Sequence, residues 1–156
     1  MSTEAPQGER MTRTKQRHVP VLLNEAIELL RVRPGATVVD CTLGLAGHSS
    51  AIARLLGAEG HLIGFDRDPA ALELARARLA EVSAELGADA PRVTLIGAAF
   101  SSIAEHVKPG SVDAVLADFG VSSLQLDEAE RGFSFMADGP LDMRMDTRTG
   151  RPPHRW

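Results

Sequence analysis

The chain has 156 residues, of which 44% are hydrophobic, and its 17 basic and 21 acidic side chains leave a formal net charge of −4. This composition is ordinary for one globular domain and excludes collagen-like, coiled-coil and strongly disordered chains. The acidic balance argues against non-specific nucleic-acid binding over the whole surface, but a local basic patch stays open.

Cysteine content and hydropathy exclude further classes. Cys41 is the single cysteine, so a disulfide framework and a multi-cysteine zinc site are excluded, and we expect no metal. A membrane span needs about 18 consecutive apolar residues, and the chain has no such run. Residues 1–17 lack the apolar stretch of a secretory signal. We therefore expect a cytoplasmic protein without a membrane anchor.

Three regions follow along the chain. Residues 1–17 carry almost no apolar side chains and predict a disordered, basic-leaning arm. Residues 18–146 predict folded structure. Residues 147–156 form an atypical tail without apolar periodicity.

Hydrophobic periodicity and turn residues place the elements of the folded region. Pro20 suits the first turn of a helix, and Asp68-Pro69 is a strong helix start because Asp is a good N-cap and Pro fits the first helical position. Ile52, Leu55 and Leu56 predict the apolar face of the second helix. In chain order, we predict a helix over 21–30, a strand over 37–42, a helix ending near 57, a strand over 61–66, a helix over 69–86 with Gly87 as its C-terminal cap, a strand over 92–96, a short helix over 101–107, a strand over 112–117, and a long irregular loop from 118 onward.

Strands that alternate with helices indicate an α/β fold with a parallel sheet. The expected object is an open, doubly wound, Rossmann-like sheet with strand order 3-2-1-4. Such sheets bind ligands beyond the carboxyl ends of their strands, at the switch point between strands 1 and 4. The unusual residues fall at these ends: 40–48, Asp66, Phe100 and Asp118.

The first candidate site is the segment 40–49, where a strand leads through glycines into a helix. Glycine lets a backbone approach a ligand closely, and a helix N-terminus offers free N–H groups. The segment does not match G-x-G-x-x-G, so a tight turn without a ligand stays an alternative. His48 alone also fits a polar residue at a helix start.

Asp66 and Asp118 are the acidic candidates. Asp66 lies at the end of the second predicted strand, about 20 residues past Gly44, where an acid can accept hydrogen bonds from two ribose hydroxyls. Because Asp68 already serves as the helix cap, we favour a ligand role for Asp66. Asp118 follows the fourth predicted strand and can accept a hydrogen bond from an amine, either of a ligand or of a base; a surface turn is the alternative.

The last loop carries two of the chain's six aromatic residues, Phe133 and Phe135. Aromatic rings in an irregular loop invite a base-stacking hypothesis, against the alternative of a solvated loop. Arg144 is a candidate phosphate ligand, whereas Met143 and Met145 are more typical of packing.

Several motifs resemble one family. They are His18-Val-Pro-Val-Leu-Leu23, Thr42-Leu-Gly-Leu-Ala-Gly-His-Ser49, Gly64-Phe-Asp-Arg-Asp-Pro69, Gly120-Val-Ser-Ser-Leu-Gln-Leu-Asp127, Glu130-Arg-Gly-Phe-Ser-Phe135 and Gly139-Pro-Leu-Asp-Met-Arg-Met145. In this order they resemble the bacterial RsmH (MraW) family, the cytosine-N4 methyltransferases of small-subunit ribosomal RNA. The resemblance runs from about His18 to Asp146. It implies a class I methyltransferase fold, S-adenosylmethionine as methyl donor, and a cytosine of 16S ribosomal RNA within the small ribosomal subunit as acceptor.

The resemblance also implies site residues. Ala46, Gly47 and His48 stand at the family's glycine-glycine-histidine cofactor loop, and Asp66 at its ribose-binding acid. Phe100 stands at a phenylalanine of the adenine site, and Asp118 and Gln125 at two further cofactor positions. The chain departs from the pattern at Ala46, where the family has glycine, at Phe119, where leucine is usual, and at Leu124, where proline is common.

The chain also departs from the family at its end. The family continues with a helical insertion and the remaining strands of a seven-stranded sheet, whereas residues 147–156 match no family segment. We therefore predict a truncated or frameshifted product whose fourth strand is an unpaired edge.

Three functions stay open. The first is N4-methylation of the cytosine, with Asp118 as a candidate catalytic acceptor and with Phe133, Phe135 and Arg144 on the RNA side. The second is an inactive fragment that at most binds S-adenosylmethionine. The third, an NAD enzyme, is disfavoured because G-x-G-x-x-G is absent. The sequence does not determine the oligomeric state.

Overall fold

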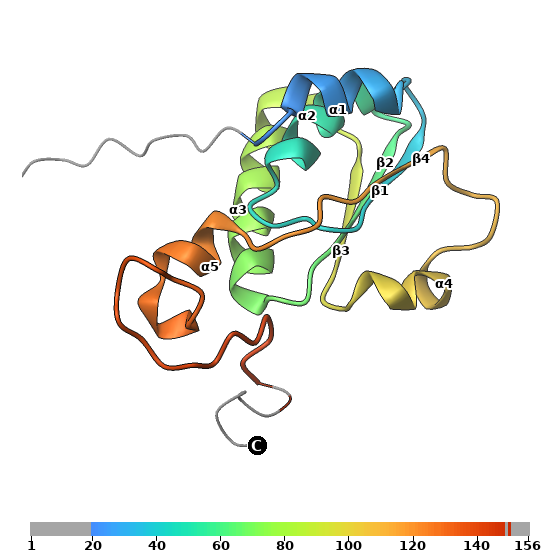
Figure 1. Ribbon diagram of the computed structural model, residues 1–156. Coiled ribbons are helices and arrows are strands. Elements are labelled where there is room, and N and C mark those ends of the chain that lie inside the picture. Colours follow the sequence, from blue (N-terminus) through green and yellow to red (C-terminus); the bar gives the residue numbers. More distant parts are fainter. Residues whose placement is uncertain (1–19, 149, 151–156) are drawn as a thin grey trace, which may run out of the picture.

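The computed structural model of the chain describes residues 20–148 and residue 150 (Figure 1). The predicted arm over 1–17 and most of the predicted tail lie outside the described residues. In chain order the elements are α1 (Leu23–Leu30), β1 (Thr37–Asp40), α2 (Gly47–Leu56), β2 (His61–Phe65), α3 (Pro69–Leu86), a 3-10 turn (Gly87–Asp89), β3 (Arg92–Ile96), a 3-10 turn (Phe100–Ser102) that runs into α4 (Ile103–His106), β4 (Ala114–Leu116), α5 (Ser123–Asp127) and a 3-10 turn (Ala129–Arg131).

The four strands form one parallel sheet in the order β3-β2-β1-β4, which confirms the predicted fold class and strand order. Val38 pairs with Leu62 on one side and with Ala114 on the other. Because all strands run the same way, the carboxyl ends of β1, β2, β3 and β4 meet at one edge of the sheet. In the described part of the chain, β4 pairs with β1 alone.

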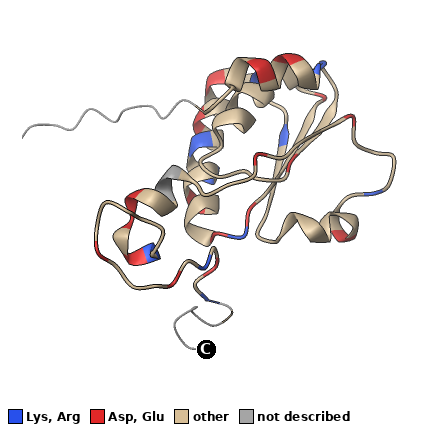
Figure 2. Cartoon of the chain, in the orientation of Figure 1, with Lys and Arg blue, Asp and Glu red and all other residues tan. Residues whose placement is uncertain are grey.

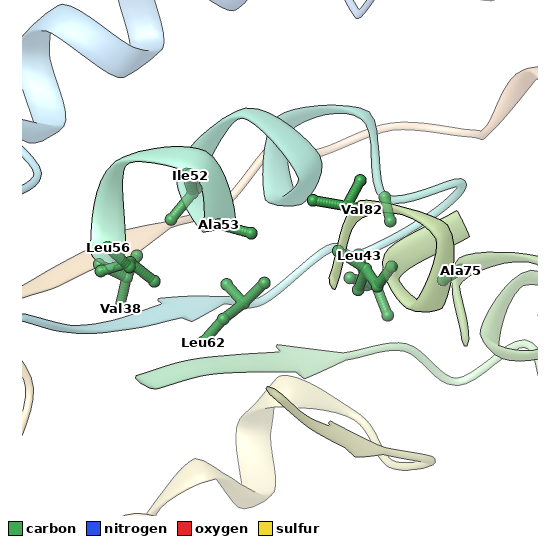
Figure 3. Close-up of a cluster of buried hydrophobic side chains, with 10 residues drawn as sticks. Val38, Leu43, Ile52, Ala53, Leu56, Leu62, Ala75 and Val82 are labelled. Carbon is green, nitrogen blue, oxygen red and sulfur yellow. The ribbon is translucent and has the colours of Figure 1, made fainter. Parts of the chain in front are cut away.

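Side chains of the strands alternate between two apolar layers, as both faces of a parallel sheet require. Val38 and Leu62 pack with α2 and α3 in the larger cluster (Figure 3). Val39, Ile63 and Phe65 pack on the other face against Ile103 of α4 and its neighbours. The ring of Phe65 also contacts His106 edge-on, with centroids 5.8 Å apart. Figure 1 accordingly shows α3 and α4 on opposite sides of the strands.

Helix boundaries follow local chemistry where a cap is encoded. The side chain of Asp68 accepts a hydrogen bond from the Ala70 amide at 3.0 Å, and Pro69 opens α3, as predicted. Gly87 ends α3 with a φ of 58°, also as predicted. In the described ranges, none of the helices is both long and apolar enough to cross a membrane.

Other local predictions were wrong. Pro20 is not in the first turn of α1: the helix begins at Leu23, after Leu22 with a left-handed φ of 52°. Leu55 does not belong to the apolar face of α2, because Ala53 takes that place in the core. The loop after β4 contains α5 and a 3-10 turn rather than irregular backbone alone.

The neighbouring residues Leu55 and Leu56 allow a matched test of the core. Leu56 is 0% exposed in the larger cluster, whereas Leu55 is 43% exposed. We expect Leu56→Ala to lower the free energy of unfolding by about 3 kcal/mol, because it leaves a cavity, and Leu55→Ala to lower it by less than about 1 kcal/mol. Urea denaturation of both variants measures the difference. Equal losses would contradict the placement of α2 on the sheet.

Candidate functional site

A cavity of about 490 Å³ lies at the carboxyl ends of the strands, where the sequence predicted a ligand site. The loop after β1, the turn after β2, the segment after β3 and the segment after β4 all contribute to its wall. Of the predicted cofactor residues, the wall contains Gly47, His48, Asp66, Phe100, Asp118 and Gln125. Ala46 does not line it and is instead buried in the core. The volume lies within the range of small-molecule sites.

Asp66 connects two neighbouring segments of this wall. Its Oδ2 accepts a hydrogen bond from the Gly44 amide at 2.8 Å, and its Oδ1 accepts one from the Asp68 amide at 2.9 Å. A carboxylate has about four acceptor positions, so two are left for a ligand. The same acid can therefore hold the loop after β1 in place and accept hydrogen bonds from two hydroxyl groups.

The entry to α2 is held in an unusual backbone conformation. Ala46 has a φ of 55°, in the left-handed region that favours glycine. Gly47 has another reason to be glycine, since an added Cβ would lie 2.2 Å from Cγ of Pro20. Pro20 thus packs directly on the start of α2, which explains why it is not part of α1.

The N-terminus of α2 forms part of the cavity wall through Gly47 and His48. Its first turn contains no acidic residue, and the first N–H groups of a helix have no partner within the helix. Such an end favours an anion. Nε2 of His48 lies 3.2 Å from the carbonyl oxygen of Val21. Because a carbonyl only accepts, Nε2 is the donor in that contact.

Another part of the wall comes from the segments after β3 and β4. Phe100 follows β3, and Asp118 and Phe119 follow β4. The Asp118 amide donates to Oγ1 of Thr42 at 2.7 Å, which ties the end of β4 to the end of β1. Among the described residues, no hydrogen bond engages the Asp118 carboxylate. The rings of Phe100 and Phe119 lie 5.6 Å apart at 55°, and both line the cavity. Aromatic surfaces of this kind suit a planar base.

Asp40 is a buried carboxyl beneath the same loop. It accepts hydrogen bonds from Oγ of Ser49 at 2.7 Å and from the Thr42 amide at 3.1 Å. Burial raises the pKa of Asp40 above the ordinary 3.8, although these hydrogen bonds act in the opposite direction. Asp40 therefore supports the loop after β1 from inside, and Ser49 is its direct partner.

Gln125 is the third residue of α5, helps to cap the start of that helix and also lines the cavity. Its Oε1 accepts from the Ser122 amide at 3.0 Å, and its own amide donates to Oγ of Ser122 at 3.3 Å. This reciprocal pair is a capping box, and the pattern Ser-x-x-Gln in the sequence could have predicted it. The cap brings the Gln125 side chain, which is buried, to the cavity wall.

The candidates for contact with RNA differ sharply in exposure. Phe133 is 8% exposed, so its ring is not accessible for stacking on a base, and that hypothesis does not fit the structure. Phe135 is 98% exposed and presents its ring to solvent. Nε and Nη2 of Arg144 donate to the two carboxylate oxygens of Asp142 at 2.5 and 2.7 Å. A phosphate would therefore compete with Asp142 for Arg144.

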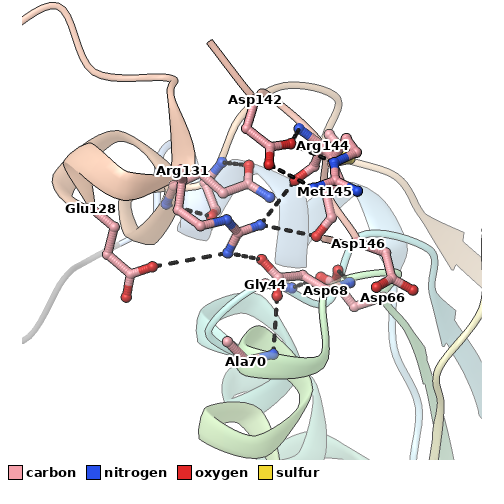
Figure 4. A network of polar contacts seen from close by, with 12 residues as sticks. Gly44, Asp66, Asp68, Ala70, Glu128, Arg131, Asp142, Arg144, Met145 and Asp146 are labelled. Atoms are coloured by element: carbon pink, nitrogen blue, oxygen red, sulfur yellow. Dashed lines mark hydrogen bonds and ion pairs between the residues drawn. The ribbon is translucent and has the colours of Figure 1, made fainter. Parts of the chain in front are cut away.

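Three functional positions were missed in the sequence. Arg131 forms a buried ion pair with Asp68 at 2.7 Å (Figure 4). Thr42 ties β1 to β4, and Met145 lines the cavity. The first two contacts join residues 63 and 76 positions apart, and no local pattern signals such a pairing.

The wall as a whole combines acids for hydroxyl or amine donors, rings for a base and a helix N-terminus for an anion. A nucleoside that carries an amino-acid group, such as S-adenosylmethionine, has all three features. Together with the strand order 3-2-1-4, this site places the chain among Rossmann-like α/β folds with a ligand cavity at the carboxyl ends of the strands.

Comparisons with known proteins narrow the class. The model of the MraW methylase family matches residues 15–153, so the chain belongs to that family. It is 64% identical over 136 residues to ribosomal RNA small subunit methyltransferase H of Acidobacterium capsulatum, covering 87% of this chain and 46% of that protein. The protein of the same name from Koribacter versatilis is 54% identical over 142 residues, covering 91% of this chain and 45% of that protein. The chain thus spans a little under half the length of these relatives.

Solved structures agree on the fold. A S-adenosylmethionine-dependent O-methyltransferase from Thermotoga maritima superposes with a TM-score of 0.54 at 22% identity, over 67% of this chain and 38% of that chain. A ribosomal RNA methylase from Streptococcus thermophilus superposes with a TM-score of 0.50 at 20% identity, over 64% of this chain and 51% of that chain. At these identities the likeness concerns the fold alone.

Ala46 offers a test of strain in the loop. A left-handed conformation costs an alanine about 1 kcal/mol, which glycine does not lose. Relief of this strain offsets the loss of the buried Ala46 methyl group, so we expect Ala46→Gly to leave the free energy of unfolding within about 0.5 kcal/mol of wild type. Ala77, exposed in the middle of α3, is the control: Ala77→Gly is expected to lower it by about 1 kcal/mol. Losses of the same size in both variants, measured by thermal and urea denaturation, would contradict the left-handed conformation.

Asp40 gives the fold a defined pH dependence. In the unfolded chain its carboxyl loses its proton near the ordinary pKa of 3.8, whereas burial keeps it protonated to higher pH in the folded chain. The folded state therefore binds more protons, and stability falls as pH rises from about 3.8 through the raised pKa. We expect the stability of wild type relative to Asp40→Asn to decline across this window and to level off above it. Urea denaturation between pH 3.5 and 7 measures that difference; a difference that does not change with pH would contradict the shift.

Proposed function

We propose that the chain binds S-adenosylmethionine in the cavity and that, as part of a longer methyltransferase, it serves N4-methylation of a cytosine in 16S ribosomal RNA of the small ribosomal subunit. Such an enzyme would act in the cytoplasm, where that subunit is found. One observation carries the proposal: Asp66, the start of α2, Phe100 and Asp118 come from four separate segments and line one cavity. The names of the relatives support the RNA substrate class.

The residues present fit the cofactor. We assign Asp66 to the ribose hydroxyls, since it keeps two acceptor positions after bonding Gly44 and Asp68. We assign Phe100, with Phe119 beside it, to the adenine. The N-terminus of α2, at Gly47 and His48, suits the carboxylate of the methionine group. Ala46 does not line the cavity, and we assign it a backbone role, since its left-handed φ of 55° sets the entry to α2.

Asp118 and Gln125 complete the cofactor side, and Asp118 also supports the acceptor side of the reaction. The cofactor, when bound, supplies a methyl group on a sulfonium. The exocyclic amine of cytosine is a weak nucleophile, so the protein's contribution is to hold it in line and to exclude water. The Asp118 carboxylate, not engaged by any described residue, can accept a hydrogen bond from that amine and orient its lone pair. We therefore propose Asp118 as the catalytic residue.

The target base must leave its stack to reach such a cavity. Phe135 is the residue that we propose for stacking on RNA, because its ring is exposed. Figure 2 shows acidic positions recurring along the segment after β4. Arg131, Arg144 and Arg148 in that region each pair with an aspartate. This segment therefore offers stacking more than positive charge, and Arg144 would bind a phosphate only by leaving Asp142.

The second candidate function is binding without catalysis. It is favoured by the coverage of the relatives, 46% and 45% of their length. Under this alternative the chain holds S-adenosylmethionine, and methyl transfer requires residues of the longer protein. A methyl-transfer assay on small ribosomal subunits with the purified chain distinguishes the two functions: transfer supports the enzyme, and binding without transfer supports the alternative.

Calorimetric titration with S-adenosylmethionine tests the site itself. Asp66→Ala removes hydrogen bonds to a charged acceptor, each worth about 1.5–3 kcal/mol, and should weaken binding by at least about tenfold. Asp89, which is exposed in the 3-10 turn after α3, is the matched control, and Asp89→Ala should bind as wild type does. Unchanged affinity in Asp66→Ala would remove the ribose assignment, and no binding to the wild-type chain would overturn the proposed function. NAD in the same titration should not bind.

A further inference from the structure

We propose that Arg131 is a positioning residue that links the cofactor side of the cavity to residues 128–146, so that a ligand in the cavity orders this segment. Residues 128–146, which include Arg131 itself, are called the 128–146 segment below. The inference rests on the proposed function for the identity of the ligand. Its geometry is independent of that function, and Figure 4 shows the contacts that carry it.

One half of the link is a buried ion pair. Nη1 of Arg131 lies 2.7 Å from Oδ2 of Asp68, and the two side chains are 10% and 2% exposed. The other oxygen of Asp68 accepts from the Ala70 amide at the start of α3. The acid is thus fixed by the helix cap, and removing its cationic partner would leave a buried charge without compensation.

The other half of the link reaches a wall of the cavity. Nη2 of Arg131 donates to the carbonyl oxygens of Arg144 at 3.2 Å and of Met145 at 2.9 Å. The carbonyl oxygen of Arg131 accepts from the Met143 amide at 3.0 Å. Met145 lines the cavity, although Arg131 itself does not. The Arg131 guanidinium therefore hydrogen-bonds the backbone of Met145, a wall residue, from outside the cavity.

Two glycines let the segment fold back on itself around Arg131. A Cβ on Gly132 would lie 2.2 Å from the carbonyl oxygen of Pro140, and one on Gly139 would lie 2.0 Å from that of Ala129. The two backbone stretches of this turn, around Gly132 and Gly139, are therefore in direct contact with the backbone opposite them. This packing explains the glycines of two sequence motifs that the methyl-transfer chemistry leaves unexplained.

The ion pair lies two residues from the proposed ribose acid. The amide of Asp68 donates to Oδ1 of Asp66 at 2.9 Å, and both Asp66 and Arg67 line the cavity. The turn after β2 thus faces the ligand on one side and Arg131 on the other. A ligand that touches both Asp66 and Met145 would favour the arrangement in which Arg131 bridges them. Linkage is reciprocal, so loss of the bridge must weaken that ligand.

Arginine is specifically suited to this position. Its planar fork places two nitrogens against an acid and two carbonyls at once, whereas the ammonium of lysine is a single point of charge. The variant Arg131→Lys therefore retains a charge for Asp68 while losing contacts with the carbonyls of Arg144 and Met145. Arg131→Met removes both.

Hydrogen exchange measured by mass spectrometry, with and without S-adenosylmethionine, tests the proposal on the full chain. In wild type, the cofactor should slow exchange in peptides from the 128–146 segment. In Arg131→Lys, these peptides should exchange faster without ligand, the protection by S-adenosylmethionine should disappear, and its Kd should rise by about tenfold. Peptides from β1, β2 and β3 should not change. Glu85→Gln, which breaks the exposed ion pair of Arg54 and Glu85, is the control and should behave as wild type.

The outcomes separate the two proposals. Unchanged segment exchange and unchanged Kd in Arg131→Lys would overturn the role of Arg131, even if the cofactor binds. Faster exchange throughout the sheet in Arg131→Lys would also overturn it, since it would show a general loss of stability. If Arg131→Met does not fold, Arg131→Lys and Asp68→Asn decide the question. If wild type binds no S-adenosylmethionine, the proposed function fails, and ligand-free segment exchange in Arg131→Lys alone decides this inference.

Discussion

The parallel pairing of β1 between β2 and β4 is the constraint on which the rest of the structure depends. Because β1 is hydrogen-bonded on both edges, its end at Asp40 is fixed relative to the ends of both neighbours. The loop from Cys41 to Leu45 starts from that fixed point and forms the part of the cavity wall next to which the other segments lie. Val38 and Val39, both fully buried, hold the strand between two apolar layers.

Four acidic side chains lie at or near the carboxyl edge of the sheet, and each makes different contacts. Asp40 is buried and supports the loop from beneath. Asp66 joins two turns while keeping acceptor positions toward the cavity. Asp68 caps α3 and holds Arg131. Asp118 alone among these four has no described hydrogen-bond partner for its carboxylate, which is why the proposed chemistry is assigned to it.

The segment after β4 shows how a polar sequence can form an ordered turn without a large core. Its glycines allow direct contact between backbones, and Arg131 supplies hydrogen bonds where apolar side chains are few. A buried ion pair of this kind adds little net stability, but it is tolerated only when its hydrogen-bond partners are accurately placed. That property suits a segment that places one side chain, Met145, on the cavity wall and leaves another, Phe135, in solvent.

The sequence by itself determined what local chemistry encodes: the cap at Asp68, the glycine that ends α3, the bounds of β3 and, through the alternation of strands and helices, the strand order. It also predicted that the cofactor candidates gather at one edge of the sheet, because the ends of parallel strands meet there, and all of them except Ala46 line the cavity. Tertiary structure alone decided which of two similar residues is used. It buried Phe133 and exposed Phe135, buried Leu56 and half-exposed Leu55, and paired Arg131 with an acid 63 residues away. Periodicity and caps act within a few residues, whereas packing and buried ion pairs depend on neighbours that only the folded chain supplies.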